Sequence, residues 1–240
     1  CIFPLTGYPA TDLDYWRKIM RTCRDFGLNH VRFHSWCPPE AAFVAADEAG
    51  IYLQPEVNLW GRVNSEEMRD YLARESERML RRYGNHPSFA LMALGNESWV
   101  THDIMRSLLQ QWKADDRRLY SGPCNANHSR LEGYGFYVGR KVEGGRIRYQ
   151  SGWPPKPENS YFASRPPQTV VDYREAVERH DLPLISHETV QRCSYPDLEQ
   201  SRKYTGSLDA AYLDIARDQL EERGMRGQYK DFIRASGRWQ

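Results

Sequence analysis

Two short apolar runs, far apart in the sequence, each end in a polar residue followed by a glutamate. The first run covers residues 89–93 and leads through Leu94, Gly95 and Asn96 into Glu97; the second covers residues 182–186 and leads into His187 and Glu188. Such runs are typical of strands buried on both faces of a parallel sheet, and barrel enzymes keep their functional side chains where these strands end. We therefore expect both glutamates at one rim of a parallel sheet.

Helix-like and strand-like segments alternate along the chain. Apolar residues recur every three or four positions in the helical segments, which have capping residues at their starts and glycines after two of their ends. The predicted helices cover residues 12–26, 39–49, 64–80, 101–115 and 170–180. The predicted strands cover residues 30–36, 51–57, 89–94, 118–121 and 182–186. Asn64 and Glu67 are predicted to form a capping box.

The alternation predicts an α/β fold with a parallel sheet. Because no glycine-rich phosphate loop follows the first strand, a (β/α)8 TIM barrel is favoured over an open nucleotide-binding sheet. We count about six strands where a closed barrel has eight, and expect the first and last strands to lie outside the chain. Residues 1–240 are thus predicted to form one partial barrel domain, with a long, pocket-shaping loop over residues 125–167.

Composition excludes several classes of partner. The formal net charge is +1, and acidic and basic residues are interleaved along the chain, so no broad positive electrostatic field attracts nucleic acid or an anionic membrane. No apolar stretch is long enough to span a bilayer. The five cysteines are scattered and form no disulfide framework or CxxC metal site. The abrupt ends of the chain suggest a piece of a longer protein, so the compartment stays open, with secretion or a periplasmic location among the possibilities.

Glu97 and Glu188 suit cleavage of a glycosidic bond, which uses one carboxylic acid and one carboxylate on either side of the sugar carbon. The alternative is that each is an ordinary surface glutamate. A metal-dependent hydrolase is disfavoured, because His30 and His34 lie roughly 13 Å apart along a strand at ~3.3 Å per residue. We predict no metal and no cofactor.

The sequence around Glu97 resembles a known family. Asn-His-Pro-Ser at residues 85–88, followed by Leu-Gly-Asn-Glu-Ser at 94–98, is similar to the strand-four signature of retaining glycoside hydrolases of the (β/α)8 clan, especially family 2, the β-galactosidase, β-glucuronidase and β-mannosidase group. The resemblance implies that Glu97 is the acid/base and that Asn96 holds the sugar 2-hydroxyl. It also implies that Glu188 is the nucleophile, although its neighbours depart from the β-galactosidase pattern.

Other parts of the chain extend this resemblance. Residues 31–36 are similar to strand two of the family, which implies that Arg32 and His34 line the base of the sugar site. A carbohydrate is the implied substrate, and accessory β-sandwich domains are expected upstream. A catalytically silent carbohydrate-binding barrel is the main alternative.

Further binding residues are predicted from their positions at strand ends. His187, like His34, either donates to sugar hydroxyls or satisfies buried neighbours. Glu56 binds a sugar hydroxyl or pairs with Arg32. Four tryptophans could stack on sugar rings or pack in the core, with Trp36 the first choice for stacking. These tryptophans are Trp36, Trp60, Trp99 and Trp153.

Overall fold

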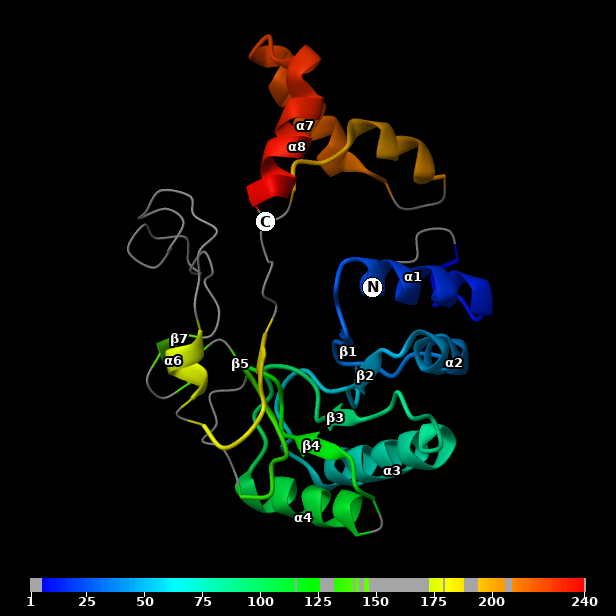
Figure 1. Cartoon of the computed structure of the whole chain (residues 1–240), viewed down its shortest axis with the longest axis vertical. Helices are drawn as coiled ribbons and strands as arrows, with labels where there is room; N and C mark the ends of the chain where they lie inside the picture. Colours follow the sequence, from blue (N-terminus) through cyan, green and yellow to red (C-terminus); the bar gives the residue numbers. More distant parts are fainter. Residues whose placement is uncertain are drawn as a thin grey trace. The chain divides into compact units, whose positions relative to one another are not determined.

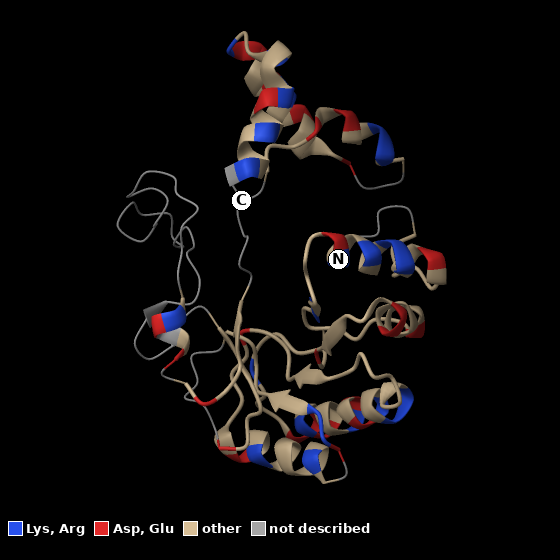
Figure 2. Ribbon diagram, in the orientation of Figure 1, with Lys and Arg blue, Asp and Glu red and all other residues tan. Residues whose placement is uncertain are grey.

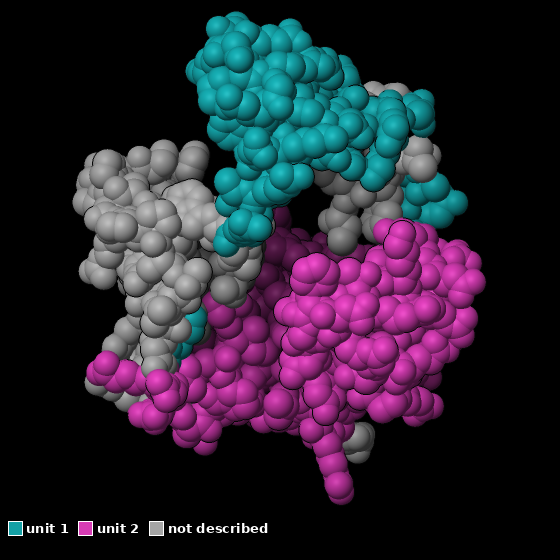
Figure 3. Space-filling model, turned by 45° about the horizontal axis from the view of Figure 1, so that its top comes forward, with its two compact units in different colours: residues 1–9, 148–173, 188–240 teal, residues 10–147, 174–187 magenta. Residues whose placement is uncertain are grey.

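The protein's structure, a computed structural model, describes residues 6–114, 116–125, 132–139, 141–142, 145–146, 173–178, 180–187, 194–205 and 209–239. The chain divides into two compact units, coloured separately in Figure 3. The larger unit comprises Ala10–Ile147 and Arg174–His187, and the smaller comprises Cys1–Pro9, Arg148–Tyr173 and Glu188–Gln240. All described strands belong to the larger unit. That residues 1–240 form a single domain stays a prediction.

Helices and strands alternate in the larger unit, as predicted. Its helices are α1 (Leu13–Asp25), α2 (Glu40–Ala49), α3 (Glu66–Tyr83), α4 (His102–Lys113) and α6 (Arg174–Val177). Its strands are β1 (His30–Phe33), β2 (Tyr52–Pro55), β3 (Leu91–Ala93), β4 (Leu119–Ser121), β5 (Tyr137–Gly139), β6 (Lys141–Val142), β7 (Gly145–Arg146) and β8 (Leu184–Ser186). The five predicted strand segments all contain a described strand.

Six of the described strands run parallel. β1 pairs with β2, β3 with β4, and β5 with β8. Parallel bridges from Leu53 to Phe89 and from Glu56 to Ala93 join β2 to β3, and the Gly135 N–H donates to the Tyr120 carbonyl (2.8 Å) between β4 and β5. The spatial order is therefore β1-β2-β3-β4-β5-β8. Within the described residues this series does not close, so the predicted barrel is observed only in part.

Local sequence signals explain most helix ends. The Asp12 side chain caps α1 by accepting from the Tyr15 N–H, and Thr101 caps α4 in the same way. Gly50 ends α2 in the left-handed conformation (φ 68°), as its position predicts. The capping box predicted at Asn64 was wrong. Ser65 is the N-cap of α3 instead, because its hydroxyl accepts from the N–H three residues ahead.

The predicted loop over residues 125–167 was also partly wrong. It contains β5, which lies between β4 and β8, and a short antiparallel pair formed by β6 and β7. Two apolar residues of this stretch, Phe136 and Val138, are fully buried. Glycines and aromatic residues surround them in the sequence, and this concealed a strand of only three residues.

The core of the larger unit lies between the parallel strands and helices α1 to α4, which line the outer side of the strands in Figure 1. Completely buried side chains from helices and strands meet there, each contributing about 1.5–3 kcal/mol by burial. They include Met20, Phe43, Leu53, Leu72, Met92, Leu94, Trp112 and Tyr120. This packing fixes the strand ends that carry the candidate site.

The smaller unit is helical in its described part. It contains the 3-10 turns η2 (Leu198–Lys203) and η3 (Arg226–Gln228) and the helices α7 (Ala211–Glu222) and α8 (Tyr229–Trp239). Leu198, Ala216 and Leu220 form its buried cluster. Acidic and basic residues both occur along α1, α3, α4, α7 and α8 (Figure 2). Among the described helices, none has the length and apolar character needed to cross a membrane.

Candidate active site

Polar side chains converge at the carboxyl ends of the parallel strands. They come from Arg32 in β1, Glu56 after β2, Asn96 after β3, Cys124 after β4 and His187 after β8. Glu56, Asn96, Cys124 and His187 are almost completely buried. Because buried polar groups are costly unless they are hydrogen-bonded, such a cluster needs a network of mutual contacts.

The centre of this network is an ion pair between Arg32 and Glu56. The Arg32 Nε donates to Glu56 Oε1, and the Arg32 Nη2 lies 3.2 Å from Oε2. The backbone N–H of Ser35 also donates to Glu56 Oε2 (2.7 Å). Bidentate pairing and the additional donors compensate for removing the Glu56 carboxylate from water. The Glu56–Arg32 pairing considered from the sequence is thus present.

Asn96 connects this ion pair to His187. Its Oδ1 accepts from Arg32 Nη2 (2.7 Å) and lies 2.9 Å from His187 Nε2. Since an arginine can only donate, the Asn96 atom that faces it is the oxygen. His187 must then carry a proton on Nε2 to complete the contact. Residues 91 positions apart in the sequence are therefore joined by one side-chain contact.

Glu97 lies beside this network in an unusual backbone conformation. Its φ is 44°, in the left-handed region that residues other than glycine rarely adopt. The Glu97 N–H donates to the Cys124 carbonyl (2.8 Å), and the Asn125 Nδ2 donates to Glu97 Oε1 (2.6 Å). The side chain is exposed. A strained, exposed carboxylate that its surroundings hold in place is a common feature of functional sites.

Gly95 allows the chain to make this turn. It has a φ of 98°, and a Cβ at this position would lie 2.3 Å from the Leu59 carbonyl oxygen. Only glycine therefore fits between β3 and Glu97. In the Leu-Gly-Asn-Glu sequence, the glycine is therefore required by the backbone, and the last two residues supply the polar side chains.

Two further predicted site residues lie near this rim. The His34 and Trp60 rings pack in an edge-to-face arrangement, with their centroids 5.0 Å apart. Trp36 is only half-buried, and its ring packs edge-on against Phe33 at 5.3 Å, next to the core. A role for either residue in sugar binding stays a prediction. Glu188 and Trp153 lie outside the described residues.

Cys124, Gln54 and Asn125 are site residues that the sequence analysis missed. The Cys124 thiol donates to Glu56 Oε1 (2.9 Å), and the Gln54 amide donates to the same atom (3.2 Å). Burial raises the pKa of the Cys124 thiol well above its usual value, which keeps the donating proton on sulfur. A polar residue inside or after a short strand was the available signal for each, but no motif singled them out.

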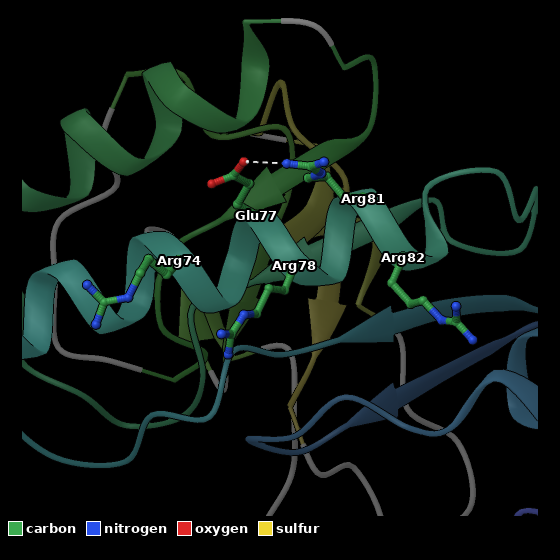
Figure 4. Close-up of a pocket in the computed structure, with 5 residues that line it drawn as sticks. All are labelled: Arg74, Glu77, Arg78, Arg81 and Arg82. Carbon is green, nitrogen blue, oxygen red and sulfur yellow. Dashed lines mark hydrogen bonds and ion pairs between the residues drawn. The ribbon is translucent and has the colours of Figure 1, made fainter.

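Among the described residues, no group of three or more potential ligand side chains could hold a metal ion. A surface pocket of about 520 Å³ lies on α3 and is lined by Arg74, Glu77, Arg78, Arg81 and Arg82 (Figure 4). All five lining residues belong to α3, and none of them takes part in the contacts of Arg32, Glu56, Asn96, Cys124 or His187. It is therefore separate from the network around Asn96.

Partial likenesses to solved glycosidase structures were found. A β-glucuronidase from Parabacteroides merdae has 22% identity and a TM-score of 0.43, with 54% of this chain and 18% of that chain covered. A GH2 β-galacturonidase from Eisenbergiella tayi, bound to galacturonate, has 22% identity and a TM-score of 0.41, covering 49% and 23%. A β-glycosidase from Bacteroides vulgatus has 18% identity and a TM-score of 0.45, covering 52% and 17%.

The chain therefore spans less than a quarter of the length of these structures. No protein-family model matches the chain, and no curated protein matches it.

Proposed function

We propose that the chain is the catalytic part of a retaining β-glycosidase that hydrolyses a terminal β-glycosidic bond. Glu97 is the acid/base, and Glu188 is the nucleophile. The substrate is an oligosaccharide or polysaccharide. The reaction needs no metal or cofactor, since both steps use carboxyl groups and water.

The convergence of Asn96, Arg32 and His187 beside Glu97 is the observation that supports this proposal most. Asn96 immediately precedes Glu97, and His187 immediately precedes Glu188. The contact between Asn96 and His187 (2.9 Å) therefore brings together the backbone segments that lead into the two proposed catalytic residues. Retaining enzymes require carboxyl groups about 5–5.5 Å apart, and we expect this spacing between Glu97 and Glu188.

In the first step, Glu188 attacks the anomeric carbon while Glu97 protonates the departing glycosidic oxygen. Asn96 is the residue proposed to hold the sugar 2-hydroxyl, and its contacts with Arg32 and His187 fix its orientation. In the second step, Glu97 removes a proton from a water molecule while its oxygen attacks the anomeric carbon, and the bond between that carbon and Glu188 breaks, which releases the sugar. The anomeric configuration is kept because the carbon is inverted twice.

The proposal is tested by removing the nucleophile from the full-length protein. Glu188→Gly should abolish hydrolysis of nitrophenyl β-glycosides, and added azide should restore turnover with a glycosyl azide of inverted configuration as the product. Glu178→Gly, an exposed glutamate ten positions earlier, is the matched control and should leave turnover unchanged. Full activity of Glu188→Gly without azide would refute the assignment of the nucleophile.

A further inference from the structure

The loops that follow β2 and β3 remain paired beyond the ends of the strands. The Asn96 N–H donates to the Leu59 carbonyl (3.0 Å), the Trp99 N–H donates to the Gly61 carbonyl (2.9 Å), and the Val63 N–H donates to the Trp99 carbonyl (3.0 Å). These bonds connect residues 59–63 to residues 96–99 as a short parallel extension of the sheet. The side chains on this extension are therefore held by a paired backbone.

Side-chain bonds reinforce the extension next to Glu97. The Gly61 N–H donates to the Ser98 hydroxyl (3.2 Å), and that hydroxyl donates to the Asn96 carbonyl (2.8 Å). Ser98 is buried, whereas Glu97 and Trp99 on either side of it are exposed. Glu97 and Trp99 thus belong to one ordered segment at the rim of the site.

This extension presents two exposed aromatic rings and one cation. Trp60 is 68% exposed and Trp99 is 53% exposed, which is unusual for such large apolar side chains. The Arg62 guanidinium lies over the Trp99 ring at 5.0 Å from its centroid, as in a cation–π pair. The Trp60 ring packs against the His34 ring.

Arg62 has donors available for a ligand. Among the residues that the structure describes, it forms no ion pair, whereas Arg78, Arg81 and Arg82 each have a carboxylate partner. A guanidinium that lies over an aromatic ring keeps N–H groups that can pair with a carboxylate in a bidentate arrangement. Stacking also reduces the conformational freedom that the side chain would lose on binding.

We propose that Trp60, Arg62 and Trp99 form a binding platform for a carboxylate-bearing sugar unit, a uronic acid, of the substrate. The indole faces contact the C–H faces of the pyranose ring, and Arg62 pairs with the carboxylate. This inference rests on the proposed glycosidase function and specifies its substrate as an acidic glycan. Since Trp99 lies two residues after Glu97, the acidic unit is bound next to the acid/base.

Binding of two matched trisaccharides tests the platform without requiring turnover. β-1,4-linked triglucuronic acid and cellotriose differ only at carbon 6, where one has a carboxylate and the other a hydroxymethyl group. Their dissociation constants are measured by titration calorimetry on the full chain at low salt, in a Glu97→Gln background that prevents hydrolysis. We expect the acidic trisaccharide to bind about tenfold more tightly than cellotriose, in keeping with one charge-assisted pair.

Variants then assign the preference to particular residues. Arg62→Gln should bring the two dissociation constants within about twofold of each other, and Trp99→Ala should weaken both ligands. Arg74→Gln is the matched control, because Arg74 is also an exposed arginine without an ion pair among the described residues, but it lies in the α3 pocket of Figure 4. This control should keep the tenfold preference.

Three results would overturn the platform: equal binding of the two sugars, loss of the preference in Arg74→Gln instead of Arg62→Gln, or equal competition by inorganic sulfate. A failed glycosidase proposal gives a different pattern. In that case the acidic preference and its dependence on Arg62 persist, while the full-length protein hydrolyses no glycoside.

Discussion

Replacing Arg32 by methionine should destabilise the chain by about 3 kcal/mol. Glu56 is completely buried, and Arg32 is its bidentate cationic partner. Removing one member of a buried ion pair costs about 3–5 kcal/mol, because the other charge stays buried without compensation. We expect the lower end of that range, since the Ser35 N–H, the Gln54 amide and the Cys124 thiol continue to donate to Glu56.

The assay is urea unfolding followed by tryptophan fluorescence, with the midpoint and slope compared between variants. Adding Glu56→Gln to Arg32→Met removes the orphaned charge, so the double variant should be more stable than Arg32→Met alone. The control is Arg106→Gln, which breaks an exposed pair with Asp103 (3.2 Å) and should cost less than about 0.5 kcal/mol. The reasoning would be refuted if Arg32→Met and Arg106→Gln lowered the free energy of unfolding equally. It would also be refuted if the double variant were less stable than Arg32→Met alone.

Three further predictions concern chemistry, pH and assembly. Glu97→Ala in the full-length protein should slow cleavage of substrates with poor leaving groups far more than of nitrophenyl glycosides, because only poor leaving groups need protonation; equal losses in kcat/KM would contradict its role as the acid. Burial lowers the pKa of His30, so below about pH 6.5 the folded chain binds fewer protons than the unfolded chain. The contribution of His30 to stability is therefore present above about pH 6.5 and is lost as the pH falls below that value. His30→Gln should therefore reduce the drop in urea midpoint between pH 7.5 and 5.5, and an unchanged drop would argue against it. Because β1 and β8 are each paired on one side only within the described residues, the isolated chain should associate as its concentration rises in light-scattering measurements, whereas a stable monomer would count against open sheet edges.

The alternation of helices and strands was predictable because caps and apolar periodicity are local signals. Asp12, Gly50 and Thr101 each mark a helix end with their own backbone or side-chain preference. Ser65 displaced the predicted Asn64 cap because both residues are good N-caps and only the three-dimensional start of α3 decides between them. The strand β5 was missed since three residues are too few to show a period.

The sequence allowed residues of the candidate site to be named at strand ends, but it did not predict most of the contacts between them. Glu56 and His187 were predicted from their positions after strands, whereas Arg32 and Asn96 were implied by the family resemblance of residues 31–36 and 94–98. The contacts among these four residues depend on the parallel order of the strands. The Asn96–His187 contact could not be derived from spacing, because it requires β3 and β8 to come near each other through β4 and β5. Cys124 and Asn125 follow a short strand whose end carries no recognisable motif.

The central claim is that Glu97 and Glu188 act as the acid/base and the nucleophile of a retaining glycosidase. Its most direct test is mass spectrometry of the full-length protein after incubation with a 2-deoxy-2-fluoro glycoside that carries a good leaving group, which slows release of a covalent intermediate. Our account predicts one added sugar, attached to the peptide that contains Glu188. Attachment to another carboxylate, or hydrolysis with inversion and no adduct, would contradict it.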